Sequence, residues 1–180
     1  MDLRFAVRTH VGLYVPSGGH KRPIWEGKNV IVTNGKQAIA RTLAALHPVF
    51  AAVSGTDPLK LSYPRHIGFG TSSASPTDTS LTALVAAANS VGTSTFKQLT
   101  DITFPATDSV RFICEYSTSE ANHPAALQEM GLFGGGALSG DPPNIAGLVL
   151  ISRVAGTFSF SKTNAAPLIA EWTYQIQEAP

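Results

Sequence analysis

The segment from Gly147 to Gln177 reads GLVLISRVAGTFSFSKTNAAPLIAEWTYQIQ and decides the fold class of this chain. In its last part the apolar side chains occupy every second position, which is the period of a strand with one buried face; they are Leu168, Ala170, Trp172, Tyr174 and Ile176. Phe158 and Phe160 alternate with polar residues in the same way, and residues 147–154 are apolar on both sides, as in an interior strand. Three strands separated by turn residues predict an antiparallel meander, whose apolar face needs a second layer.

Further strands are expected along the rest of the chain, at residues 3–7, 65–70, 96–104, 110–117 and 126–133. About eight short strands and one helix predict a mainly β chain, folded as a two-layer antiparallel β-sandwich of jelly-roll type. We expect residues 1–180 to form this single domain. Residues 1–27 are a candidate N-terminal segment for contacts with a neighbour.

One main α-helix is predicted at about residues 35–47. Asn34 can accept a hydrogen bond from a backbone N–H of the first turn, and Pro48 ends the helix because it blocks the α conformation of the residue before it. The apolar stripe repeats at helical spacing and consists of Ile39, Leu43 and Leu46. We expect this helix to pack on one face or end of the sandwich.

The composition favours a protein that packs against neighbours. Charged residues make up only 14% of the chain, against about 25% in an average soluble domain. The net charge is +1, and no basic stripe is present that could bind nucleic acid. His20, Lys21 and Arg22 form the only basic cluster, within a predicted Gly/Pro loop at residues 17–23. A solvated loop tip is the favoured interpretation of that cluster, and a phosphate site is the alternative.

Cys114 is the sole cysteine, so no intrachain disulfide and no cysteine-based metal site are expected. The first ten residues lack the apolar core of a secretory signal. The longest apolar run, residues 39–53, is interrupted by polar residues and proline, and it is too short to cross a bilayer. We therefore expect a chain made in the cytoplasm that has no membrane partner.

No catalytic or metal-binding motif stands out in the sequence. The five histidines are scattered, with no pair at helical spacing. The segment from Gly68 to Gly70 lacks the third glycine and the following lysine of a phosphate-binding loop. We therefore expect no enzyme activity, no metal and no cofactor.

Glu129 is the most informative charge, because it shares a predicted strand face with apolar or small residues. A carboxylate in that position is costly unless it is paired or hydrogen-bonded. The functional interpretation is a general acid or a cation ligand. The favoured structural interpretation is that Glu129 accepts backbone N–H groups of a neighbouring loop or pairs with Arg153.

Two tryptophans are candidates for a carbohydrate-stacking surface. Trp172 lies on the apolar face of its predicted strand and is expected in the core. Trp25, near Gly18 and Gly19, is the better candidate for an exposed aromatic residue that contacts a ligand or a neighbour.

The order of short segments resembles that of small virion proteins of tailed bacteriophages. In those proteins a GTG…SP.DT.L segment precedes an EAN…I.E.GLF…L.AR…I.K…L.I.W.I.F pattern. The matching segments here are residues 29–35, 66–71, 74–81, 110–112, 120–122, 129–133, 150–153, 160–162 and 169–176. The resemblance covers most of the chain from about Asn29 onward.

The resemblance implies a non-enzymatic structural subunit of the phage particle, located in the neck, collar or tail region or at the fibre attachment. Its expected partners are copies of itself and other virion proteins, held together through extended edges and apolar loop contacts. Two alternatives remain open: a capsid decoration protein and a carbohydrate-binding β-sandwich module.

Overall fold

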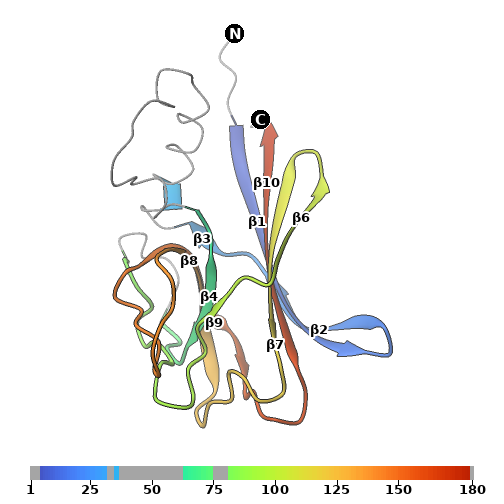
Figure 1. Ribbon diagram of the computed structural model, residues 1–180. Helices are drawn as coiled ribbons and strands as arrows, with labels where there is room; N and C mark the ends of the chain where they lie inside the picture. Colours follow the sequence, from blue (N-terminus) through green and yellow to red (C-terminus); the bar gives the residue numbers. More distant parts are fainter. Residues whose placement is uncertain (1–4, 32–34, 37–62, 75–80, 179–180) are drawn as a thin grey trace.

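The computed structural model describes residues 5–31, 35–36, 63–74 and 81–178. The described residues are mainly β and form two antiparallel five-stranded sheets (Figure 1). Sheet A consists, from edge to edge, of β2 (His20–Gly27), β1 (Phe5–Ser17), β10 (Leu168–Glu178), β7 (Ser109–Tyr116) and β6 (Asp101–Ala106). Sheet B consists, in the same sense, of β3 (Val30–Ile31), β9 (Leu148–Phe160), β8 (Leu127–Gly135), β4 (His66–Gly70) and β5 (Lys97–Gln98).

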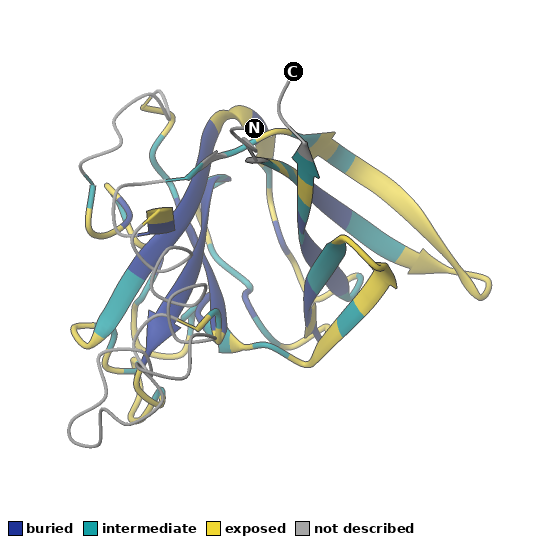
Figure 2. Ribbon diagram, turned by 90° about the horizontal axis from the view of Figure 1, so that it is seen from above, coloured by how far each residue is buried: buried dark blue, intermediate teal, exposed yellow. Residues whose placement is uncertain are grey.

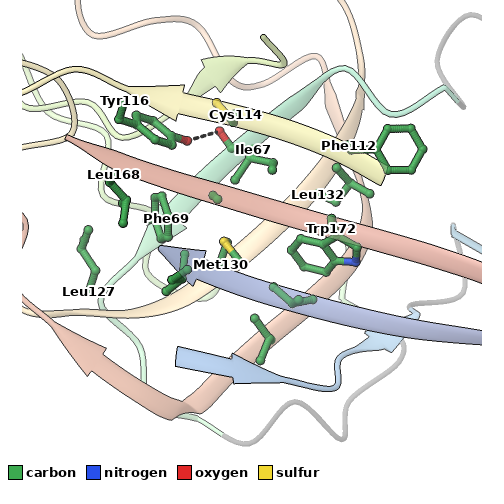
Figure 3. Close-up of a cluster of buried hydrophobic side chains, with 14 of the residues drawn as sticks. Ile67, Phe69, Phe112, Cys114, Tyr116, Leu127, Met130, Leu132, Leu168 and Trp172 are labelled. Carbon is green, nitrogen blue, oxygen red and sulfur yellow. Dashed lines mark hydrogen bonds between the residues drawn. The ribbon is translucent and has the colours of Figure 1, made fainter. Parts of the chain in front are cut away.

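The two sheets share one hydrophobic core, drawn in Figure 3. Sheet A contributes Val11, Leu13, Phe112, Cys114 and Trp172, and sheet B contributes Ile67, Phe69, Met130, Leu132 and Val154. The Tyr116 hydroxyl also joins the layers, because it donates to the backbone oxygen of Ile67 at 3.0 Å. Each fully buried large side chain contributes about 1.5–3 kcal/mol relative to an exposed one, so this shared core is what holds the two sheets together.

The alternation predicted for the last strand is confirmed from Leu168 to Tyr174, and β10 lies at the centre of sheet A. Trp172 is fully buried and lies opposite Val11 of β1 and Phe112 of β7. The predicted meander is wrong, however, because its first two strands belong to β9 of sheet B while its third, β10, belongs to sheet A. Alternation specifies which side chains face the core but not which strands pair, and residues 161–167 carry the chain from one sheet to the other.

The two strands predicted at residues 147–154 and around Phe158 and Phe160 are one long strand, β9. Its pairing with β8 shifts register between Leu127 and Glu129, opposite a stretch of β9 that contains Gly156. Gly156 has a φ of 68°, a conformation that glycine adopts without strain. An irregularity of this kind bends a strand without ending it, which explains why the sequence pattern seemed to end at Val154.

The predicted helix at residues 35–47 is not borne out. All ten elements found among the described residues are strands. Of the predicted span only Gly35 and Lys36 are described, and the apolar stripe on which the prediction rested lies outside the described residues.

The predicted loop at residues 17–23 is instead part of a β-hairpin. Gly18 and Gly19 have φ values of 56° and 82° and form a two-residue turn between β1 and β2, as expected for hairpin turns that need positive φ at both positions. The hairpin projects from the body as an exposed arm (Figures 1 and 2). His20, Lys21 and Arg22 therefore lie on a strand of this arm.

Candidate functional site

Glu129 and Arg153 form a buried ion pair inside sheet B. Arg153 Nε donates to Glu129 Oε1 at 2.5 Å, and the two side chains are 1% and 0% exposed, respectively. The carboxylate also accepts the backbone N–H groups of Val85 at 2.9 Å and Ala86 at 3.2 Å. Arg153 Nη2 donates to the backbone oxygen of Ala74 at 3.2 Å. Both structural partners considered for Glu129 in the sequence, a neighbouring loop and Arg153, are therefore present together.

This ion pair fastens loop segments to the sheet. Val85 and Ala86 lie outside the named strands, in the connection between β4 and β5, and Gly70 bridges to Ala87 beside them. A Cβ at Gly70 would lie 2.5 Å from both Ala86 O and Glu129 Oε2, so the loop backbone lies directly against the strand. A carboxylate that is fully buried and holds three donors is arranged for structure, since a general acid has to reach a substrate.

The other candidate residues lie on the β1–β2 arm of sheet A, whereas the ion pair belongs to sheet B. His20 and Arg22 are exposed there, while Lys21 Nζ contacts Glu171 Oε1 of β10. Lys21, which lies close to the turn of the arm, therefore links the arm to the outer face of sheet A.

Trp25 is only partly accessible. Its ring packs against Phe158 with a centroid separation of 5.1 Å, and it borders the hydrophobic core. A carbohydrate platform needs the face of an aromatic ring free for stacking, so this packing disfavours Trp25 as a sugar-binding residue. Its packing on β9 instead anchors the arm.

The outer face of sheet A carries a charged group that the sequence analysis did not identify. Glu171 is 6% exposed and lies between Lys21 and Arg111, whose Nη1 is 3.8 Å from Glu171 Oε2. Beside it, the Tyr14 hydroxyl donates to Glu26 Oε1 at 2.6 Å. Burial, followed by the hydrogen bond to the Glu26 carboxylate, raises the pKa of Tyr14 above its usual value. In the sequence, Glu171 appears only as a carboxylate on the outward-facing side of a strand whose other side is buried. That pattern does not indicate that the carboxylate is itself buried.

An apolar surface remains uncovered at one end of sheet A. Along β10 the exposed fraction rises from 0% at Trp172 to 8% at Tyr174 and 47% at Ile176, all on the face that carries the core. Ile102 and Phe104 of β6 are 46% and 76% exposed. The backbone N–H of Ile176 donates to Asp108 O at 2.9 Å, so the end of β10 meets the β6–β7 turn. We call Ile102, Phe104 and Ile176 the apolar end of sheet A.

The terminal strands of the two sheets are poor templates for adding another strand. β3 and β5 are two residues long. The edge strands β2 and β6 contain Pro23 and Pro105, which cannot donate a backbone hydrogen bond, and the pairing of each with its neighbour shifts register. Short strands, prolines and bulges are common devices against edge-to-edge pairing. The extended-edge contacts expected from the sequence are thus disfavoured at these four strands, which leaves side-chain surfaces as the better candidates.

The described residues contain neither a candidate metal site nor a candidate membrane-spanning helix. Within residues 5–31, 35–36, 63–74 and 81–178, no three His, Cys, Asp or Glu side chains are grouped so that they could hold a metal ion. No helix in the described part of the chain has the length and hydropathy needed to span a membrane.

Comparison of the chain with models of protein families, with curated proteins and with solved structures gives no match.

Proposed function

We propose that this chain is a non-enzymatic structural subunit of a tailed-phage virion, present in multiple copies in the neck, collar or tail region or at the fibre attachment. The resemblance of its segment order to small phage virion proteins supports the assignment. The proposal includes a jelly-roll-like sandwich as the fold of the subunit, supported by the core that the two sheets share.

The observation that carries the proposal is the apolar end of sheet A. Phe104 alone is 76% exposed, and Ile102 and Ile176 lie on the same end of the sheet. Burying such side chains releases roughly 25 cal/mol per Å² of apolar surface. Contact with a neighbouring subunit that covers this end would be stabilised by that burial. A catalytic role would not require these apolar side chains to be exposed.

The two alternatives differ in how the structure bears on them. A capsid decoration protein would use the same apolar end to bind its neighbour. This alternative therefore changes the location of the subunit in the particle and keeps its structural role. A carbohydrate-binding module is not favoured, because Trp25 packs against Phe158 and borders the core.

Quantitative mass spectrometry of purified particles tests the proposal. We expect the protein in the virion at several copies per particle. Particles produced with a Phe104→Asp variant should contain less of it, because a charge at the apolar end opposes burial against a neighbour. A Val91→Asp variant, altered at another exposed apolar residue, should be incorporated normally. Absence of the wild-type protein from infectious particles rejects the proposal.

A further inference from the structure

The first half of β1 is a strand edge that is neither short nor interrupted by proline or a register shift, unlike the other edges. β1 pairs with β10 from Phe5 to Tyr14, but β2 covers its other side only from Val11 to Ser17. No strand among the described residues pairs with the β2 side of residues 5–10 (Figure 1). This stretch, FAVRTH, contains no proline. In an antiparallel pair every second residue directs its N–H and C=O away from its partner, so these backbone groups have no strand partner within the described ranges.

A groove of about 570 Å³ follows the same edge. The described residues that line it come from β1, from β10 and from the segment that leaves β2 for sheet B; they are Val7, Arg8, Thr9, His10, Lys28, Asn29, Thr173 and Gln175. This set includes two cations, a histidine and several neutral hydrogen-bonding groups, and no carboxylate. Arg8, His10 and Lys28 are exposed, so these side chains can contact a ligand.

A carboxylate beside the groove, that of Glu26, is already engaged. Glu26 Oε1 lies 3.7 Å from His10 Nε2, but it also accepts the Tyr14 hydroxyl at 2.6 Å. Asn29 lines the groove beside β1, because the Thr9 hydroxyl donates to the backbone oxygen of Asn29 at 3.5 Å. The groove therefore combines a positive rim with a backbone edge that has no strand partner among the described residues.

We propose that residues 5–10 of β1, with Lys28 and Asn29, bind an extended acidic peptide segment as an added strand of sheet A. Backbone hydrogen bonds to the edge would supply affinity, and alternate side chains would supply specificity. Arg8 and His10 share one face of β1, so carboxylates two positions apart on the added strand would reach them. The intervening residues would face the side of Val7 and be apolar. This inference does not depend on a virion location, because any protein could supply such a segment.

An amide NMR titration of the full chain tests the inference. The probe is a capped peptide of about six residues, the usual length of a strand, that alternates valine with glutamate. We expect shifts concentrated at residues 5–10, 28 and 29, with binding that weakens as salt is raised. A lysine-for-glutamate peptide should bind far more weakly. Absence of binding by the acidic peptide, equal binding of both peptides, or shifts that map elsewhere would overturn the proposal.

Two N-methylated forms of the acidic peptide separate strand addition from simple charge attraction. One is methylated on odd and the other on even backbone nitrogens. Strand addition predicts that only one of them binds, because alternate N–H groups face the protein; equal binding of both refutes it.

Charge reversal on the protein provides a matched control. Arg8→Glu should weaken the acidic peptide at least about fivefold, since opposite charges across an interface become like charges. Arg22→Glu makes the same change in charge on the exposed arm and should leave binding unchanged. Both replaced side chains are exposed, and amide spectra recorded without peptide will show that each variant is folded. Equal losses in the two variants would reduce the effect to net charge and contradict the proposal.

Discussion

Glu129 and Arg153 are adjacent-strand residues of sheet B whose charged groups meet at 2.5 Å with almost no exposure to solvent. The carboxylate also binds two backbone N–H groups of the β4–β5 connection. The pair thus links sheet B to the connection between β4 and β5.

Glu129→Gln should destabilise the protein by about 3 kcal/mol, because it leaves the Arg153 charge buried without its counter-charge. Urea denaturation followed by tryptophan fluorescence measures the change. Glu115→Gln, an exposed carboxylate on β7, should change the free energy of unfolding by less than about 0.5 kcal/mol. Equal effects of the two substitutions would show that the buried pair has no special role.

The coupling between the two side chains can be measured separately. Arg153→Met should also destabilise the protein, since it leaves the carboxylate uncompensated. The double variant Glu129→Gln/Arg153→Met should lose less than the sum of the two single losses, by about 1 kcal/mol or more. Strict additivity would mean that the ion pair itself contributes nothing.

Stability should fall on mild acidification partly because of His66. Burial, together with the nearby positive charge of Arg65, lowers the pKa of His66 in the folded state. An unfolded histidine takes up a proton near pH 6.5, so below that pH the unfolded state binds protons that the folded state does not. The folded state therefore loses stability as the pH falls from about 6.5 toward the lower folded pKa, by at most about 1.4 kcal/mol per pH unit for one proton.

His66→Gln should flatten this part of the stability profile, measured by urea unfolding at several pH values between 7 and 5, a window set by the unfolded pKa of about 6.5. His20→Gln on the exposed arm serves as the control and should keep the wild-type slope. An unchanged slope in the His66 variant would assign the acid sensitivity to other groups.

Cys114 should resist thiol reagents in the native protein. Its side chain is fully buried, and burial raises the pKa of the thiol to about 12, so the reactive thiolate is scarce at neutral pH. Iodoacetamide labelling detected by intact mass should be slow in native buffer and complete in denaturant. Labelling at the rate of a free thiol under native conditions would contradict the assigned burial.

Lys162 should hold the connection between β7 and β8 in place. Its ammonium donates to the backbone oxygens of Ser117 at 3.1 Å and Thr163 at 2.8 Å, and to Asn122 Oδ1 at 3.2 Å. Lys162→Met removes these charge-assisted bonds and should cost about 2 kcal/mol, with faster hydrogen exchange in residues 117–123. Lys36→Met, at an exposed lysine, should do neither; unchanged exchange in the Lys162 variant would argue against the tether.

The sequence predicted the faces of strands better than their partners. Alternation around Trp172 correctly identified the buried face of β10, because that period depends only on local geometry. It could not show that β10 inserts between β1 and β7, since pairing is decided by long-range packing. Glu129 could be identified from the sequence as a charge on an apolar strand face. Glu171 could not, because its partners Lys21 and Arg111 come from other strands.

Turn chemistry explains the other main difference. The stretch from Ser17 to Pro23 is rich in glycine and proline, which is typical of a loop, but Gly18 and Gly19 alone make the turn. The residues after them then continue as β2, so the basic cluster lies on a strand. The open edge at residues 5–10 could not be found from the sequence, because it depends on where β2 leaves the sheet.

Sedimentation velocity over a range of concentrations tests most directly whether this chain assembles through the apolar end of sheet A. Wild-type protein should form species larger than the 18.9 kDa monomer as concentration rises. Phe104→Ser should shift the distribution toward monomer, and Val91→Ser, at another exposed apolar residue, should sediment like wild type. A wild-type protein that remains monomeric up to its solubility limit, or a Phe104→Ser variant that assembles as well as wild type, would contradict the account.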